Sequence, residues 1–324
     1  MKNLSLINYI KKKNYKKIFT PSPSFPIENL LGLSSNFSRG DKDFEKQFNS
    51  VVKRLKKISG QNKIVSIQGP GSLAIEIGLL NFLKGKVLVV NTGYYSQRIK
   101  KILLDAKKNY KFLTKIDTIN YQNVKNIKKK YDWICACYTE TSTGFKIDIQ
   151  ELNKIVKKKQ SRLFIDATAS IGIEKYHNLA DVVTFSSCKS LFGFTGACFV
   201  GYKKDPQNKI NSFMLDINNH INKKMTGPNT TIQSLDFVLK KYSKFKKKVI
   251  MNKKNFMKKF SKFLIYPNKN QPNICTYINK KVRAGKNLIF YKPRVQNRGS
   301  IIFHLGSGHL NKNYNKINNC IHIR

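Results

Sequence analysis

From residue 41 to about residue 201, short apolar runs alternate with segments whose hydrophobic residues recur at helical spacing. The helical pattern is clear at 41–59, where Phe44 and Leu55 share one face and Gly60 marks the end. The apolar runs, which are typical of buried strands, lie at 63–67, 86–90, 133–138, 162–168 and 181–185. This alternation predicts an α/β fold with an open, largely parallel sheet.

Both ends of the chain depart from this pattern. Residues 1–20 are basic and weakly patterned, which predicts a short helix and an arm, and three prolines then make 21–26 extended. Residues 208–265 are lysine-rich at helical spacing, and short strands at 274–278 and 300–304 precede a predicted closing helix. The predicted divisions are an arm over 1–20, a large domain over 21–235 and a smaller C-terminal α+β domain over 236–324.

A carboxylate and a lysine follow one another at the ends of two successive predicted strands. Asp166 ends the strand in 162–168, and Lys189 follows the next strand among small hydroxyl and thiol side chains. A lysine ammonium close to apolar residues is desolvated and can become the neutral amine that a Schiff base requires. Pyridoxal phosphate needs such a lysine for its aldehyde and a carboxylate that keeps its pyridine nitrogen protonated. We therefore predict a pyridoxal phosphate site with Lys189 and Asp166 as its catalytic residues.

A glycine-rich turn at 69–71 leads from the strand at 63–67 into a predicted helix. Backbone N–H groups at a helix N-terminus carry partial positive charge, so Gly71, Ser72 and Leu73 could bind a phosphate. The turn lacks both the GxGxxG pattern and the closing GK[ST] of a P-loop. Taken alone, this turn is better explained as an ordinary connection between a strand and a helix. Only together with Lys189 and Asp166 does it indicate a phosphate site.

Two more strand ends offer candidates. Tyr95, beyond the strand at 86–90, could stack on a planar cofactor ring or simply pack between helix and sheet. Thr141 lies in the hydroxyl-rich segment after the strand at 133–138, where such residues bind polar ligand atoms or cap helices. Ligands of open parallel sheets bind at the carboxyl ends of the strands, where all of these candidates fall.

The formal net charge is +45, from 62 basic and 17 acidic residues. Such a charge could indicate a nucleic-acid or anionic-membrane partner, or a drift toward A- and T-rich codons, which encode lysine, asparagine, isoleucine and tyrosine. The 54 lysines against eight arginines favour drift, because phosphate and base recognition favours the planar fork of arginine. We therefore expect no nucleic-acid partner, although the charge would steer small anionic substrates inward.

The six cysteines show no CxxC spacing, which indicates reduced thiols and neither a disulfide framework nor a metal site. No apolar stretch has the length of a membrane span or of a signal-peptide core. These features predict a cytoplasmic protein with no membrane contact.

These motifs together resemble those of the class V, fold-type I pyridoxal-phosphate-dependent aminotransferases. The matching segments are TPSP at 20–23, GPGS at 69–72, GYYSQR at 93–98, ETSTG at 140–144, DATASIG at 166–172, SSCK at 186–189 and LGSG at 305–308. Within the class, the chain looks most like the 2-aminoethylphosphonate:pyruvate aminotransferases, with the alanine:glyoxylate aminotransferases as close relatives. The resemblance implies a large domain with a mostly parallel seven-stranded sheet, a smaller C-terminal domain and a homodimer.

The resemblance also implies a role for each matching residue. Tyr95 would stack on one face of the cofactor ring, Thr168 would press the other, and Thr141 would bond near the ring oxygen. Ser186 would help to hold the phosphate, and Thr226 would reach the site of the neighbouring subunit. The complete implied cofactor-binding set is Gly71, Ser72, Leu73, Tyr95, Thr141, Asp166, Thr168, Ser186, Lys189 and Thr226.

The substrate contacts differ from the pattern of the family. The arginine that grips the substrate carboxylate in the family is matched here by His304, which lacks the guanidinium fork. The Pro-Gly-Pro of the family is matched by a segment with Ser22 at its centre, and Arg294 or Arg298 could compensate for the missing arginine. These four residues are the substrate-binding candidates.

The implied reaction is a ping-pong transamination between a small anionic amine such as 2-aminoethylphosphonate and pyruvate or another small 2-oxo acid. The alternatives are another class V enzyme with the same cofactor (an alanine:glyoxylate-type aminotransferase, a lyase or a desulfurase) and a non-catalytic basic nucleic-acid-binding protein on this scaffold.

Overall fold

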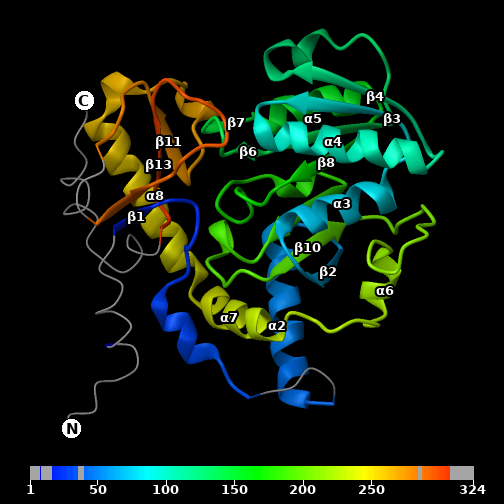
Figure 1. Cartoon of the computed structure of the whole chain (residues 1–324), viewed down its shortest axis with the longest axis horizontal. Helices are drawn as coiled ribbons and strands as arrows, with labels where there is room; N and C mark the ends of the chain where they lie inside the picture. Colours follow the sequence, from blue (N-terminus) through cyan, green and yellow to red (C-terminus); the bar gives the residue numbers. More distant parts are fainter. Residues whose placement is uncertain (1–7, 9–16, 36–39, 284–286, 307–324) are drawn as a thin grey trace.

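The structure, a computed structural model, describes Asn8 and residues 17–35, 40–283 and 287–306 (Figure 1). Its centre is a seven-stranded sheet. In spatial order the strands are β2 (Lys63–Gln68), β10 (Ala197–Tyr202), β9 (Val182–Ser186), β8 (Arg162–Asp166), β5 (Trp133–Cys137), β3 (Gly85–Asn91) and β4 (Leu113–Asn120). Strand β10 runs antiparallel to both β2 and β9, and the other pairs are parallel. The predicted α/β fold with a mostly parallel sheet is therefore confirmed.

Helices cover both faces of this sheet (Figure 1). They are α2 (Lys42–Ser59), α3 (Gly71–Phe82), α4 (Tyr94–Asn109), α5 (Ile149–Lys158), α6 (Ile217–Ile221), α7 (Asn229–Lys240) and α8 (Tyr242–Lys259). The 3-10 turns are η1 (Ile27–Gly32), η2 (Tyr121–Asn126), η3 (His177–Leu179), η4 (Lys189–Leu191), η5 (Ser261–Phe263) and η6 (Asn268–Asn270).

The inner strands are apolar on both sides because each side meets a layer of helices. In β3, Val87 and Val89 pack in the cluster formed with α3 and α4, whereas Leu88 and Val90 pack in the cluster formed with α2, α5, α7 and α8. Successive side chains of a strand point to opposite faces, so a strand buried on both sides becomes a continuous apolar run. This explains why five of the seven strands could be located from the sequence.

The predicted helix at 41–59 is α2, and the sequence sets both of its ends. The Asp41 carboxylate accepts hydrogen bonds from Asp43 N at 2.9 Å and Phe44 N at 3.1 Å, which satisfies two amides of the first turn. Gly60 follows the last turn with φ 66°, the left-handed conformation that glycine adopts without strain.

The C-terminal part contains α8 and an antiparallel pair formed by β11 (Cys275–Ile278) and β13 (Ser300–Phe303), as predicted for this region. Strand β1 (Lys17–Phe19) pairs in parallel with β12 (Leu288–Phe290), so the start of the described chain packs on this part. A smaller pair, β6 (Thr139–Glu140) and β7 (Phe145–Lys146), follows β5. The predicted closing helix and most of the N-terminal arm lie outside the described residues.

The boundary that we expected between residues 235 and 236 falls within α7, which is continuous from 229 to 240. We therefore propose to place the division at the junction of α7 and α8, where both helices stay whole. Within the described ranges, no helix combines the length and the apolar character needed to cross a bilayer.

Candidate active site

A cavity of about 610 Å³ opens at the carboxyl ends of the sheet strands and the N-terminus of α3, which is the volume range of small-molecule sites. Segments far apart in the sequence meet in its wall, from the turn before α3 to the loop before β13. The predicted site residues that line it are Gly71, Ser72, Tyr95, Thr141, Asp166, Thr168, Ser186, Lys189 and Arg294.

Asp166 and Lys189 reach this cavity from adjacent parallel strands. Asp166 is the last residue of β8 and is only 5% exposed, and its Oδ1 accepts a hydrogen bond from Thr168 N at 2.9 Å. Lys189 begins the 3-10 turn just after β9, and its Nζ lies 5.3 Å from the centroid of the Tyr95 ring. The two groups thus face one space from two backbones held in register by the sheet.

Tyr95 is fixed by a buried carboxylate. Glu140 Oε2 accepts hydrogen bonds from Tyr95 N and Ser96 N, each at 3.0 Å, and Glu140 is fully buried. Burial raises the pKa of Glu140, while the hydrogen bonds from Ser142, Ser96 and Tyr95 oppose this shift. The carboxylate therefore caps the N-terminus of α4 and sets the position of the tyrosine ring.

The turn before α3 leaves room for a phosphate. The helix begins at Gly71 with no side chain capping its first amides. A Cβ at Gly71 would lie 3.2 Å from Thr168 Oγ1 and 3.4 Å from Ser186 Cβ, so a larger residue would crowd this space. Thr168 Oγ1 is buried and has no hydrogen-bond partner within the described structure. Free helix amides and hydroxyl groups together suit a phosphate group.

Five predicted residues do not line this cavity. Leu73 turns its backbone amide to Pro70 O at 2.9 Å. Ser22 is half-buried, and its carbonyl accepts a hydrogen bond from Thr20 Oγ1 at 2.6 Å. Arg298 is exposed on the loop before β13.

His304 lies in the core of the C-terminal part. Its side chain is fully buried, its Nε2 lies 2.9 Å from Thr276 Oγ1, and its ring packs against Phe256 at 5.2 Å. It does not approach the cavity, contrary to what its match with the substrate-binding arginine of the family led us to expect. The histidine contributes to packing because β13 turns its side chain toward α8.

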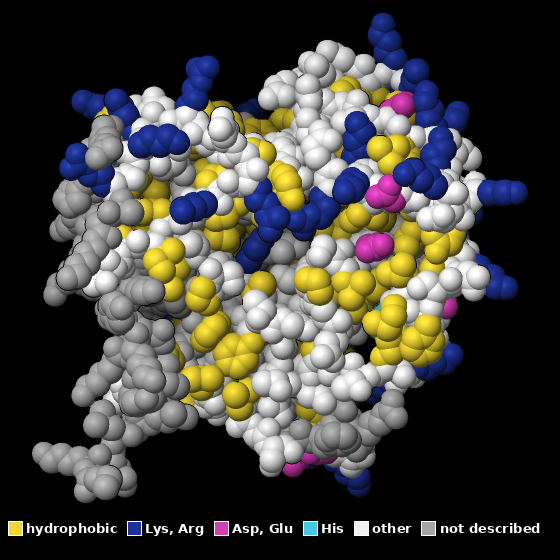
Figure 2. Space-filling model, in the orientation of Figure 1, with side chains coloured by type: hydrophobic (Ala, Val, Ile, Leu, Met, Phe, Trp, Pro, Cys, Tyr) yellow, Lys and Arg dark blue, Asp and Glu magenta, His cyan; other side chains and the backbone are white. Residues whose placement is uncertain are grey.

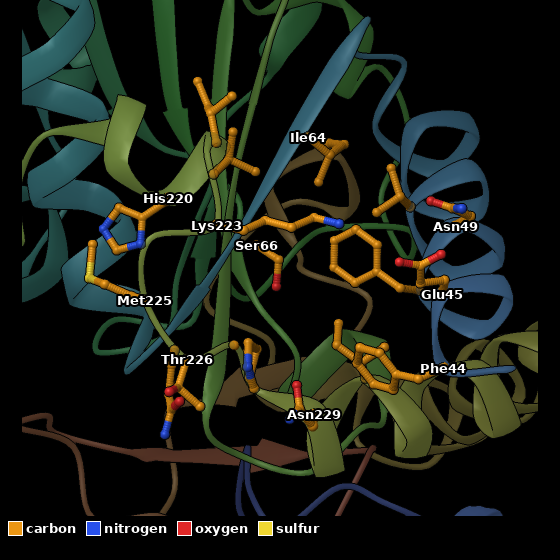
Figure 3. A pocket seen from close by; sticks show the side chains of 18 of the residues that line it. Phe44, Glu45, Asn49, Ile64, Ser66, His220, Lys223, Met225, Thr226 and Asn229 are labelled. Atoms are coloured by element: carbon orange, nitrogen blue, oxygen red, sulfur yellow. The ribbon is translucent and has the colours of Figure 1, made fainter. Parts of the chain in front are cut away.

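Thr226 lies in a second cavity of about 440 Å³ between α2, β2 and the segment before α7 (Figure 3). The threonine is exposed, and its carbonyl lies 3.1 Å from the side-chain nitrogen of Gln68 when that amide is oriented to donate. Gln68 lines both cavities, so the two are neighbours.

Arg98 also lines the candidate site, although no role was predicted for it. Its guanidinium lies over the Tyr95 ring at 5.0 Å. Residues three apart lie on the same side of a helix, so the contact between Tyr95 and Arg98 could have been inferred from the GYYSQR segment, where α4 begins at residue 94.

Cys188 and Cys137 line the cavity as well, and burial raises the pKa of Cys137 well above its usual value.

The fold is that of pyridoxal-phosphate-dependent aminotransferases. An alanine–glyoxylate aminotransferase from Nostoc sp. superposes with a TM-score of 0.76 at 15% identity, over 91% of each chain. A phosphoserine aminotransferase from Cytophaga hutchinsonii gives a TM-score of 0.79 at 15% identity, over 95% of this chain and 98% of its own.

The family model of class-V aminotransferases matches residues 31–232, and the chain belongs to this family. Membership of this family and the aminotransferase fold imply pyridoxal phosphate as its cofactor. The 2-aminoethylphosphonate–pyruvate transaminase of Pseudomonas aeruginosa is 28% identical over 197 residues, which are 56% of this chain and 53% of that protein. The corresponding protein of Pseudomonas putida is 29% identical over 201 residues, 58% and 55% of the two chains. The chain spans about half the length of these curated relatives.

Proposed function

We propose that the chain catalyses a transamination between a small anionic amine, of the 2-aminoethylphosphonate kind, and pyruvate or another small 2-oxo acid. The observation that supports this most is the delivery of Lys189 and Asp166 to one cavity from adjacent strands. The names of the relatives from Pseudomonas support the choice of amine and oxo acid.

The residues of the cavity suit the parts of the cofactor. The Gly71 and Ser72 amides at the start of α3 and the Ser72 and Ser186 hydroxyls would hold its phosphate. Tyr95 would cover one face of the ring, Thr168 would press the other, and Thr141 would bond near the ring oxygen. When bound, pyridoxal phosphate supplies an electron sink for charge that develops on the substrate carbon.

Two side chains would carry the chemistry. Asp166, buried at the end of β8, would keep a proton on the pyridine nitrogen through a charge-assisted hydrogen bond. Lys189 would hold the aldehyde in the resting enzyme and, as a free amine, would move a proton at the α carbon of the substrate. Its position beside the Tyr95 ring keeps the amine close to the place where the substrate must lie.

The assembly that we propose is a homodimer in which Thr226 reaches the site of the neighbouring subunit. Two observations support it: Thr226 is exposed, and it contacts Gln68, which lines the candidate site. Light scattering of the purified protein should give twice the mass of the chain, and a monomer mass that persists at high protein concentration would contradict this assembly.

We also propose the reducing cytoplasm as the location of the protein, because the cysteines in the described residues are free.

The decisive experiment is the visible absorbance of the purified protein with and without Lys189→Ala. We expect the wild type to show the absorbance of a lysine-bound cofactor, to lose it when 2-aminoethylphosphonate is added, and to regain it with pyruvate. Lys189→Ala should lack this band, whereas Lys154→Ala, on an exposed lysine of α5, should keep it. An identical spectrum for Lys189→Ala and wild type would refute the assignment.

A further inference from the structure

Two arginines from distant parts of the chain meet at the mouth of the candidate site. Arg98 belongs to α4, and Arg294 belongs to the connection between β12 and β13. Their Cζ atoms lie 5.5 Å and 5.4 Å from the centroid of the Tyr94 ring, and Arg294 Nη1 lies 3.3 Å from the Tyr94 hydroxyl oxygen. Both side chains line the cavity.

Neither guanidinium has a carboxylate partner among the residues that the structure describes. Two cations held around one ring repel each other. Hydrogen bonds and charge from Arg294 and then Arg98 lower the pKa of Tyr94, as expected for a hydroxyl in a positive field. An anion placed here would relieve this repulsion.

Arginine is rare in this chain, so two arginines at one cavity indicate a specific role. The chain has 54 lysines and only eight arginines, so a basic residue placed by composition alone would be a lysine. Arginine offers a planar fork that binds two oxygens of a phosphonate or carboxylate at once, which lysine cannot do. Two forks at one mouth suit an acid with two negative charges and three oxygens.

The position of the pair limits the size of the ligand. Arg98 Cζ lies 5.0 Å and Lys189 Nζ lies 5.3 Å from the centroid of the same Tyr95 ring. The two atoms are therefore at most about 10 Å apart, which limits the length of a ligand that reacts beside Lys189 and also reaches Arg98.

We propose that Arg98 and Arg294, with the Tyr94 hydroxyl between them, form the subsite that binds the dianionic phosphonate of a short amine donor. This inference rests on the proposed transamination and adds its specificity determinant, because it takes over the anion contact that His304 does not supply. Alanine carries its only acid, a carboxylate, directly on the reacting carbon, one bond closer to the amine than the phosphonate of 2-aminoethylphosphonate, so it should depend less on the subsite.

A binding experiment tests the subsite without any reaction. Calorimetric titration of the cofactor-loaded protein with methylphosphonate should show binding that weakens about ten- to a hundredfold in Arg98→Met and in Arg294→Met. Arg283→Met, which removes an exposed arginine outside the cavity, should bind like the wild type. Arg98→Lys, which keeps the charge and loses the fork, should fall between the wild type and Arg98→Met. Equal methylphosphonate binding by wild type and both methionine variants would overturn the proposal, and tighter binding of malonate than of methylphosphonate would overturn the phosphonate class.

A kinetic experiment separates this proposal from the proposed function. The concentration of 2-aminoethylphosphonate needed for half-maximal loss of the cofactor absorbance should rise about ten- to a hundredfold in both methionine variants, while the value for alanine changes little. If no amine reacts but methylphosphonate still binds through both arginines, the transamination fails and the subsite stands. If 2-aminoethylphosphonate reacts equally well in all variants, the transamination stands and the subsite fails.

Discussion

The buried side chain of Lys253 predicts how the stability of the protein depends on pH. This residue of α8 is only 5% exposed, and its Nζ donates hydrogen bonds to Cys275 O at 2.8 Å and to Gln271 Oε1 at 3.4 Å. None of the described carboxylates forms an ion pair with it. Burial lowers its pKa from 10.5 to about 7, because the charged form loses its hydration.

The sign and size of the effect follow from this shift. Between about pH 7 and pH 10.5 the unfolded chain binds a proton that the folded chain does not, so stability rises with pH across this window. One proton corresponds to about 1.4 kcal/mol per pH unit, so the penalty should shrink by about 2 kcal/mol between pH 7.5 and pH 9.0. Below pH 7 both states are protonated, and the full penalty persists.

Lys253→Met removes the titrating group and keeps the apolar stem. The free energy of unfolding of this variant minus that of wild type should therefore be about 2 kcal/mol larger at pH 7.5 than at pH 9.0. The lost hydrogen bond to Cys275 O shifts both values equally and cancels in this difference. Urea unfolding at the two pH values, followed by circular dichroism, measures it.

The neighbouring exposed lysine is a matched control. Lys254→Met removes one ammonium from an exposed position of the same helix, so it controls for the loss of a positive charge as such. If Lys253→Met and wild type differ by the same amount at both pH values, the ammonium is hydrated in the folded protein and the reasoning is wrong.

Two further substitutions test the supports of the site. Glu140→Ala leaves the amides of Tyr95 and Ser96 without their acceptor, so the free energy of unfolding should fall by about 2–4 kcal/mol and cofactor affinity should fall with it, measured by thermal unfolding and cofactor titration. Gly78→Ala would place a Cβ 2.9 Å from Thr184 Cγ2, between α3 and the sheet, and should lower the stability by about 1–3 kcal/mol despite the better helix propensity of alanine. An unchanged melting temperature would contradict either expectation.

The sequence predicted the sheet and much of the candidate site because both depend on local signals. Apolar runs locate strands that are buried on two faces, and the ends of parallel strands gather at one edge. Asp166 and Lys189 could therefore be assigned to one site before any contact was known. Strands β4 and β10 were not among the predicted strands; β4 lies at the edge of the sheet, and pairs of polar residues separate its apolar residues Leu113, Ile116 and Ile119.

The remaining features depend on contacts between distant segments. The reversed direction of β10 leaves no trace in an apolar run, which reads the same both ways. His304 occupies a position that matches an arginine of the family, yet its side chain packs against Phe256 because the local strand turns it inward. The contact between Arg294 and Tyr94 depends on the path of the whole connection before β13. The pattern of polar and apolar residues does not predict that path.

The distribution of basic residues connects the unusual composition with the proposed specificity. Lysine and arginine side chains project at many points of the face shown in Figure 2, with fewer acidic groups among them, as expected for solvated surface charges. Two arginines make defined contacts through their planar groups: Arg54 lies 3.1 Å from the buried Asp236 carboxylate, and Arg162 stacks on Trp133 at 4.2 Å. Arg98 and Arg294 share this property but have an aromatic ring and no carboxylate as their neighbour. The many lysines therefore provide a general attraction for anions, and the two arginines at the cavity mouth are the groups able to distinguish one anion from another.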